Sequence, residues 1–154
     1  MRFILISLLA LFIAGPAFAD SDRECQVISN AIDPTEAGAT DDYINLADGS
    51  FSATVADEDE FIVPTNVKVW GLAVTVDVAP TADDTWAITI VDDGVATGVT
   101  CSITGASDVS CNDFSNVASV ASGSDLTVLV DSSTGLADPA AAAEIRFGFC
   151  ISQR

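Results

Sequence analysis

Residues 67–78 read VKVWGLAVTVDV, and from Trp70 onward every second position carries a large apolar side chain. The positions between them carry Gly, Ala, Thr and Asp. This period of two, rich in β-branched residues, is typical of a strand that buries one face against a core. The pattern returns in residues 85–91, where Trp86, Ile88 and Ile90 share one face. We therefore expect two neighbouring strands with both tryptophans in one core.

Other short apolar runs alternate in the same way, and turn sequences separate them. Residues 48–50 (Asp-Gly-Ser) and 92–94 (Asp-Asp-Gly) suit tight turns, since glycine accepts the positive φ that hairpin turns need. No amphipathic helical pattern of ten or more residues occurs in residues 20–154. The side chains that we expect in the core are Trp70, Leu72, Val74, Trp86, Ile88, Phe147 and Phe149.

These short strands at fairly even spacing predict an all-β fold, a jelly-roll β-sandwich of about eight to ten antiparallel strands. A jelly roll suits the length of the chain and brings its first and last strands close together. An immunoglobulin-like sandwich is the alternative. It would have a cysteine pair that brackets a core tryptophan, whereas both tryptophans here precede Cys101 and Cys111.

Residues 1–19 have the three parts of a secretory signal peptide. Arg2 gives a positive start, residues 3–14 are apolar but too short to span a bilayer, and residues 17–19 (Ala-Phe-Ala) form a small-residue cleavage site. No lipidation motif and no second long apolar run follows. We therefore expect a single β-sandwich domain of residues 20–154 without membrane insertion. Its expected location is extracellular or at the cell surface, with the periplasm as an open alternative.

The exported part contains four cysteines, and an even number in an oxidising compartment indicates two disulfides. Sequence alone allows three pairings. We favour Cys101 with Cys111, because they flank a short turn rich in Gly, Ser and Asp, and hence Cys25 with Cys150. A metal site is the weaker alternative, since the chain has no Cys-x-x-Cys motif and no histidine.

The chain is strongly acidic, with 23 Asp and Glu against five Lys and Arg and a net charge of −18. Removal of residues 1–19 takes away Arg2, so that four basic residues remain against 23 acidic ones, a net charge of −19. Such a surface repels nucleic acid, anionic lipid and acidic polysaccharide at long range. The charge has two interpretations: solubility of a secreted protein, or the binding of divalent cations.

Several acidic residues gather in predicted loops, which is where calcium ligands from different strands could converge. Residues 57–60 read Asp-Glu-Asp-Glu, and acidic pairs occur at 41–42, 83–84 and 92–93. None of them has the spacing of an EF-hand, so a solvated loop remains the alternative interpretation. Calcium is the one cofactor that this composition indicates, and the candidate ligands are Asp57, Asp59, Asp92 and Asp93.

The sequence offers no catalytic constellation. Histidine is absent, which excludes Ser-His-Asp and Cys-His catalysis. Disulfide formation would remove the thiol nucleophiles. Glycosidase chemistry needs only two carboxylates, but the aromatic platforms that hold sugars are scarce: Trp70 and Trp86 lie on core faces, and Tyr43 is the only tyrosine. We predict that the protein is not an enzyme.

The second half of the chain resembles a bacterial and phage jelly-roll module similar to the complement-globular-head and tumour-necrosis-factor superfamily. The resemblance covers about 90 residues from Phe61 onward. It includes a proline-led start and long strand in residues 63–78, a Thr-Cys strand in residues 99–103 with Cys111 ten residues after Cys101, and the turn at 122–126. Acidic residues replace the family's basic ones in the hairpin at 91–94. The resemblance implies a ten-strand sandwich that often trimerises and serves in fibres, surface layers or receptor binding, without a catalytic residue.

Two functions from different classes follow. The first is a non-catalytic exported structural protein, a self-associating jelly-roll subunit of an extracellular surface layer, fibre or filament, present as a trimer or polymer. The second is a calcium-dependent adhesin or carbohydrate-binding lectin-like module, whose partner would be a glycan or a surface receptor. We favour the first, because strands and disulfides are clearer in the sequence than any ligand site.

Overall fold

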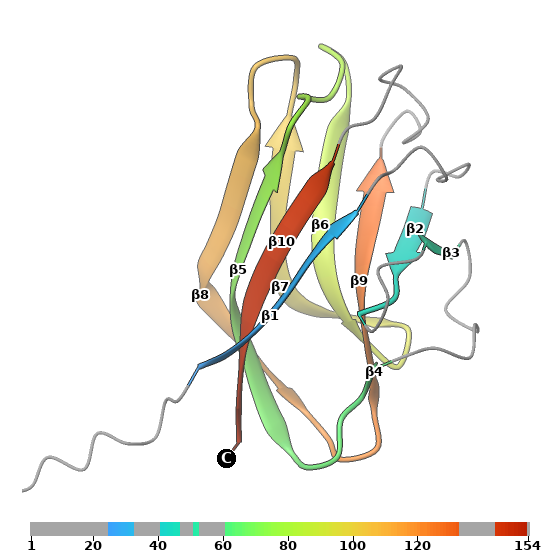
Figure 1. Cartoon of the computed structure of the whole chain (residues 1–154), viewed down its shortest axis with the longest axis vertical. Coiled ribbons are helices and arrows are strands. Elements are labelled where there is room, and N and C mark those ends of the chain that lie inside the picture. Colours follow the sequence, from blue (N-terminus) through green and yellow to red (C-terminus); the bar gives the residue numbers. More distant parts are fainter. Residues whose placement is uncertain (1–24, 33–40, 47–50, 53–60, 133–143, 154) are drawn as a thin grey trace, which may run out of the picture.

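The computed structural model of the chain is built from strands (Figure 1). The residues that it describes are 25–32, 41–46, 51–52, 61–132 and 144–153. They form β1 (Gln26–Ile32), β2 (Asp41–Ile44), β3 (Phe51–Ser52), β4 (Phe61–Ile62), β5 (Val67–Val76), β6 (Thr85–Asp92), β7 (Val95–Thr104), β8 (Ser110–Val120), β9 (Asp125–Ser132) and β10 (Ile145–Gln153). Within these ranges no helix is long and apolar enough to cross a membrane. The all-β class is confirmed, and the predicted signal peptide lies outside the described residues.

Antiparallel pairing joins the strands into two sheets around one hydrophobic core (Figure 1). The four-stranded sheet has the order β1-β10-β5-β8, and the six-stranded sheet has the order β3-β2-β9-β6-β7 with β4 beside β9. The main pairs are nested along the chain: β6 pairs with β7, β5 with β8, β2 with β9, and β1 with β10. Such nesting is that of a long hairpin rolled into two sheets, so the predicted jelly-roll sandwich is confirmed.

The two strands with the clearest alternation, β5 and β6, lie in different sheets. The prediction that they are neighbours is wrong. β5 lies between β10 and β8, while β6 lies between β9 and β7. The chain crosses from one sheet to the other between these strands, so both contribute inward side chains to one core without pairing with each other. Neighbours in sequence pair often, but a jelly roll separates several of them.

Most of the predicted core is buried, with one exception. Trp70 is only half-buried, whereas its neighbour Val69 is fully buried. A β-bulge lies between Trp70 and Leu72, and the added residue changes the face to which successive side chains point. The prediction for Trp70 is therefore wrong, because the period of two does not continue through the bulge. The predicted core residues that are buried are Leu72, Val74, Trp86, Ile88, Phe147 and Phe149.

Gly71 makes this bulge possible, because its φ is +71°. We expect Gly71→Ala to lower the free energy of unfolding by about 1 to 2 kcal/mol, since a residue with a Cβ is strained at positive φ. Crowding adds little, because a Cβ at Gly71 would lie 3.6 Å from Cys150 Sγ and 3.9 Å from Phe114 Cδ1. Urea unfolding measures the difference. Thr75→Ala, at an exposed position of β5, is the control, and a Gly71→Ala protein as stable as that control would contradict the strain argument.

Two disulfides stabilise the sandwich, one between residues far apart in the sequence and one between consecutive strands. Cys25, which precedes β1, is bonded to Cys150 of β10, with a sequence separation of 125 and a Cα–Cα distance of 5.0 Å. Cys101 of β7 is bonded to Cys111 of β8, with a sequence separation of 10 and a Cα–Cα distance of 5.7 Å. This is the pairing favoured from the sequence. The second bond joins an edge strand of one sheet to an edge strand of the other.

Candidate functional site

Asp93, a candidate calcium ligand, has a structural role in the fold. It lies in the turn between β6 and β7 with φ of 48°. Its carboxylate accepts hydrogen bonds from Ser124 Oγ at 3.0 Å and from the Asp125 backbone N–H at 2.9 Å. The Asp93 backbone N–H in turn donates to the Asp125 carbonyl at 2.9 Å. The side chain thus connects the β6–β7 turn with the turn before β9.

The other calcium candidates do not assemble into a site within the described part of the chain. Asp92 is the last residue of β6, next to Asp93, and its Oδ1 is buried without a hydrogen-bond partner. No group of three or more His, Cys, Asp or Glu among residues 25–32, 41–46, 51–52, 61–132 and 144–153 could hold a metal ion. Asp57 and Asp59 lie outside these ranges. Calcium binding therefore stays a prediction.

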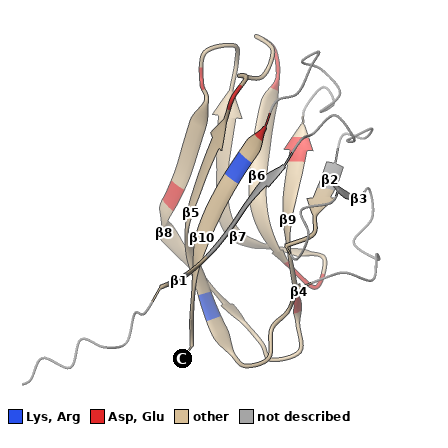
Figure 2. Ribbon diagram, in the orientation of Figure 1, with Lys and Arg blue, Asp and Glu red and all other residues tan. Residues whose placement is uncertain are grey.

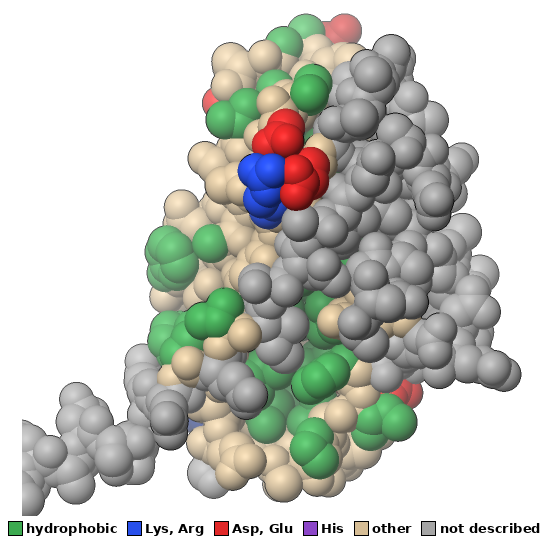
Figure 3. Space-filling model, viewed as in Figure 1, with side chains coloured by type: hydrophobic (Ala, Val, Ile, Leu, Met, Phe, Trp, Pro, Cys, Tyr) green, Lys and Arg blue, Asp and Glu red, His purple; other side chains and the backbone are tan. Residues whose placement is uncertain are grey.

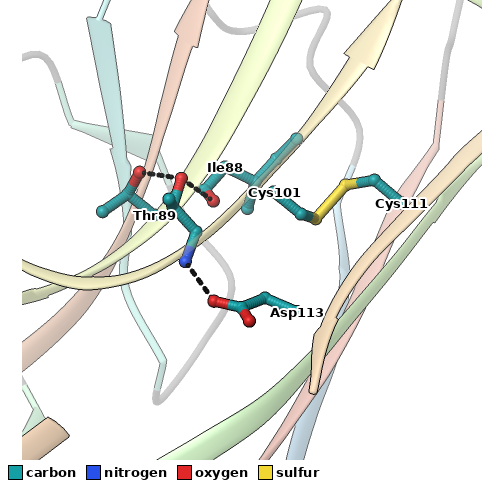
Figure 4. Close-up of a disulfide and its surroundings, with 6 residues drawn as sticks. Ile88, Thr89, Cys101, Cys111 and Asp113 are labelled. Carbon is teal, nitrogen blue, oxygen red and sulfur yellow. Dashed lines mark hydrogen bonds between the residues drawn. A yellow bond between two sulfur atoms is a disulfide. The ribbon is translucent and has the colours of Figure 1, made fainter. Parts of the chain in front are cut away.

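Asp113 is a buried carboxylate that accepts five hydrogen bonds, and it lies beside the Cys101–Cys111 bond (Figure 4). Its side chain is 6% exposed, although it carries a charge. One oxygen accepts from the backbone N–H groups of Ser115 and Asn116 and from Ser115 Oγ at 3.0 to 3.1 Å. The other accepts from the Thr100 backbone N–H at 3.1 Å and from Asn116 Nδ2 at 2.9 Å. Asp113 therefore connects β8 to β7.

These hydrogen bonds decide the charge state of Asp113. Burial on its own would raise the pKa of the carboxyl group, but the donors from Asn116, Thr100 and Ser115 together hold its pKa well below the ordinary value of 3.8. Asp113 is not among the functional residues predicted from the sequence. The available signal was a carboxylate two positions after Cys111 in an alternating strand, on a face where an apolar residue is usual.

A second buried carboxylate, Asp84, holds the tryptophan of β6 in place. Asp84 is 1% exposed, and one of its oxygens accepts a hydrogen bond from Trp86 Nε1 at 2.8 Å. Ser132 Oγ, at the end of β9, donates to the same carboxylate at 3.0 to 3.1 Å. The Thr85 backbone N–H adds a bond of 2.7 Å. The buried acids Asp84 and Asp113 thus serve as acceptors that join strands of the sandwich.

The solvent face of the four-stranded sheet carries an unusual row of apolar side chains. Val27, Cys150, Trp70 and Val117 are successive register partners across β1, β10, β5 and β8. Val27 is 63% and Val117 51% exposed, while Trp70 and Cys150 are half-buried. Phe114, 67% exposed, lies near Gly71 on the same side. We call these five side chains the apolar row, and it is the candidate functional site of the described chain.

Comparisons with known proteins place the chain in no family. No protein-family model and no curated protein matches it. A solved structure described as the capsid asymmetric unit of cyanophage Pam1 is similar over 100% of both chains, with 14% sequence identity and a TM-score of 0.47. The resemblance to the complement-globular-head and tumour-necrosis-factor superfamily stays an expectation.

Proposed function

We propose that this protein is a non-catalytic, exported structural subunit that associates with copies of itself in an extracellular surface layer, fibre or filament. The observation that carries the proposal is the apolar row. On a monomeric soluble protein, contiguous exposed apolar side chains usually mark a surface that binds another molecule. Here the row crosses all four strands of one sheet instead of lining a concave pocket, which suits a flat protein contact better than a small ligand.

The construction of the sandwich supports the same proposal. The Cys25–Cys150 bond fastens the start of the domain to its last strand, and the Cys101–Cys111 bond fastens one sheet to the other. The buried carboxylates of Asp84 and Asp113 are engaged by donors from neighbouring strands. The absence of histidine removes the commonest catalytic base from the whole chain. Disulfides are usual in small exported domains, and the hydrogen bonds that engage these two carboxylates add further links between strands.

Sedimentation velocity of residues 20–154, with both disulfides intact, tests the proposal. We expect trimers or larger assemblies whose proportion rises with protein concentration, because association of identical subunits follows mass action. The measurement is made in calcium and again in chelator. Assemblies that dissolve in chelator would add calcium to the contacts between subunits. A protein that stays monomeric in both buffers at every concentration would contradict the proposed function, and a monomer whose thermal midpoint rises with calcium would favour the adhesin alternative.

A further inference from the structure

We infer that the solvent face of the four-stranded sheet is the surface through which one copy of this chain contacts a second copy. The inference rests on the proposed function and adds to it the location of the contact. Two observations carry it: the distribution of charge between the two sheets, and the apolar row. The occupant to which these observations point is another molecule of the same acidic protein.

Carboxylates are almost absent from the four-stranded sheet. Of the 23 acidic residues in the chain, only Asp113 lies within β1, β5, β8 or β10, and its side chain is buried. The six-stranded sheet, in contrast, has acidic residues in β2, β6 and β9. Two of the five basic residues, Lys68 and Arg146, belong to β5 and β10, where Figure 2 shows them in blue. The strands of the two sheets thus differ in charge.

Among the described residues, two acidic groups that border this face, Asp77 and Glu144, are paired with Arg146. Arg146 forms ion pairs with Asp77, at 3.1 Å, and with Glu144, and these contacts raise the pKa of the guanidinium further. Figure 3 shows blue and red side chains next to one another in the upper part of this view, with hydrophobic side chains below them. Among the described residues, the rest of the face therefore offers a second molecule apolar, small, hydroxyl and amide side chains with the cation of Lys68.

Charge explains why the partner should be a second copy. Two exported chains that each carry four basic and 23 acidic residues, a net charge of −19, repel each other, and the repulsion is strongest where carboxylates face carboxylates. Contact through the carboxylate-free face avoids that arrangement, whether the face meets its own equivalent or presents Lys68 to an acidic surface of the next molecule. An acidic protein that has to assemble with itself needs a face of this kind.

The face is large enough for a specific contact. Its strands contain 7 to 11 residues, and four strands about 4.8 Å apart with about 3.3 Å per residue span roughly 19 by 30 Å. Two such faces of roughly 570 Å² each would bury about 1,100 Å² together, which is less than a standard interface but more than the roughly 1,000 Å² that a specific interface needs. The apolar row crosses the face from edge to edge, so contact with a second copy would remove Val27, Phe114 and Val117 from water together.

Matched valine substitutions test the location of the contact. Val117→Glu and Val27→Glu each place a carboxylate on the face, while Val95→Glu makes the same chemical change in β7 of the other sheet, at a side chain that is 67% exposed. Sedimentation velocity of the exported chain measures self-association, and thermal unfolding verifies that each variant is folded. We expect Val117→Glu and Val27→Glu to weaken self-association at least about tenfold, since each would bury a charge and lose apolar contact. Val95→Glu should assemble like the wild type.

The outcomes separate the inference from the proposed function. A wild-type protein that is monomeric under all conditions overturns both. A wild type that assembles, together with folded Val117→Glu and Val27→Glu variants that assemble equally well, overturns only the location of the contact. The same holds if Val95→Glu weakens assembly as much as the other two, because the effect would then follow from added charge anywhere on the molecule.

Discussion

Removal of the Cys25–Cys150 bond is expected to lower the free energy of unfolding by about 4 to 5 kcal/mol. The bond closes a loop of 125 residues, so in the chain-entropy model it restricts the unfolded chain more than a short-range bond does. Such a loss is a large part of the roughly 5 to 15 kcal/mol that stabilises a typical domain. Urea unfolding of the Cys25→Ala/Cys150→Ala variant, compared with the wild type, measures it.

The second disulfide supplies the matched control. Cys101→Ala/Cys111→Ala opens a loop with a sequence separation of only 10, for which the same model gives about 2 to 3 kcal/mol. The denaturant midpoint should therefore fall further for the first variant than for the second. A larger fall in the midpoint for Cys101→Ala/Cys111→Ala would contradict the chain-entropy explanation. It would mean that the bond between β7 and β8 also stabilises contacts in the folded protein.

The elements that could be predicted from the sequence are those that depend on local patterns. Alternation identified the strands of residues 67–76 and 85–92, because a strand with one buried face has a period of two wherever it lies in the fold. The spacing and context of the cysteines favoured the pairing found in the structure. These signals need no knowledge of which strands pair.

These local patterns could not predict which distant strands pair with each other. Two consecutive strands show the same alternation whether they pair in a hairpin or lie in different sheets. The sequence pattern therefore could not assign β5 and β6 to opposite sheets. Trp70 was misplaced by the bulge at Gly71, where a glycine inside a strand is the recognisable sign. The apolar row could not be found from sequence at all, since it exists only when β1, β10, β5 and β8 align.

Asp113 could not be identified from the sequence either, because its role depends on the contact between β8 and β7. We expect Asp113→Ala to lower the free energy of unfolding by about 2 to 4 kcal/mol, because the backbone N–H groups of Thr100, Ser115 and Asn116 lose a charged acceptor in a partly buried place. The neighbouring Cys101–Cys111 bond keeps β7 and β8 together, so the variant should still fold. Urea unfolding at neutral pH measures the loss.

The pH dependence of stability distinguishes the charge of Asp113 from its shape. Its pKa is depressed in the folded protein, so its contribution is fully present above the ordinary value of 3.8 and is lost progressively as the pH falls below it. Asp113→Asn keeps the shape but has no proton to gain. The difference in unfolding free energy between wild type and Asp113→Asn should therefore be largest at neutral pH and shrink in acid.

Asp83→Asn, at an exposed turn position, removes the same charge as a control. A wild type whose advantage over Asp113→Asn stays constant down to pH 3, or shrinks no more than its advantage over Asp83→Asn, would contradict the role of the ionised carboxylate in joining the two sheets.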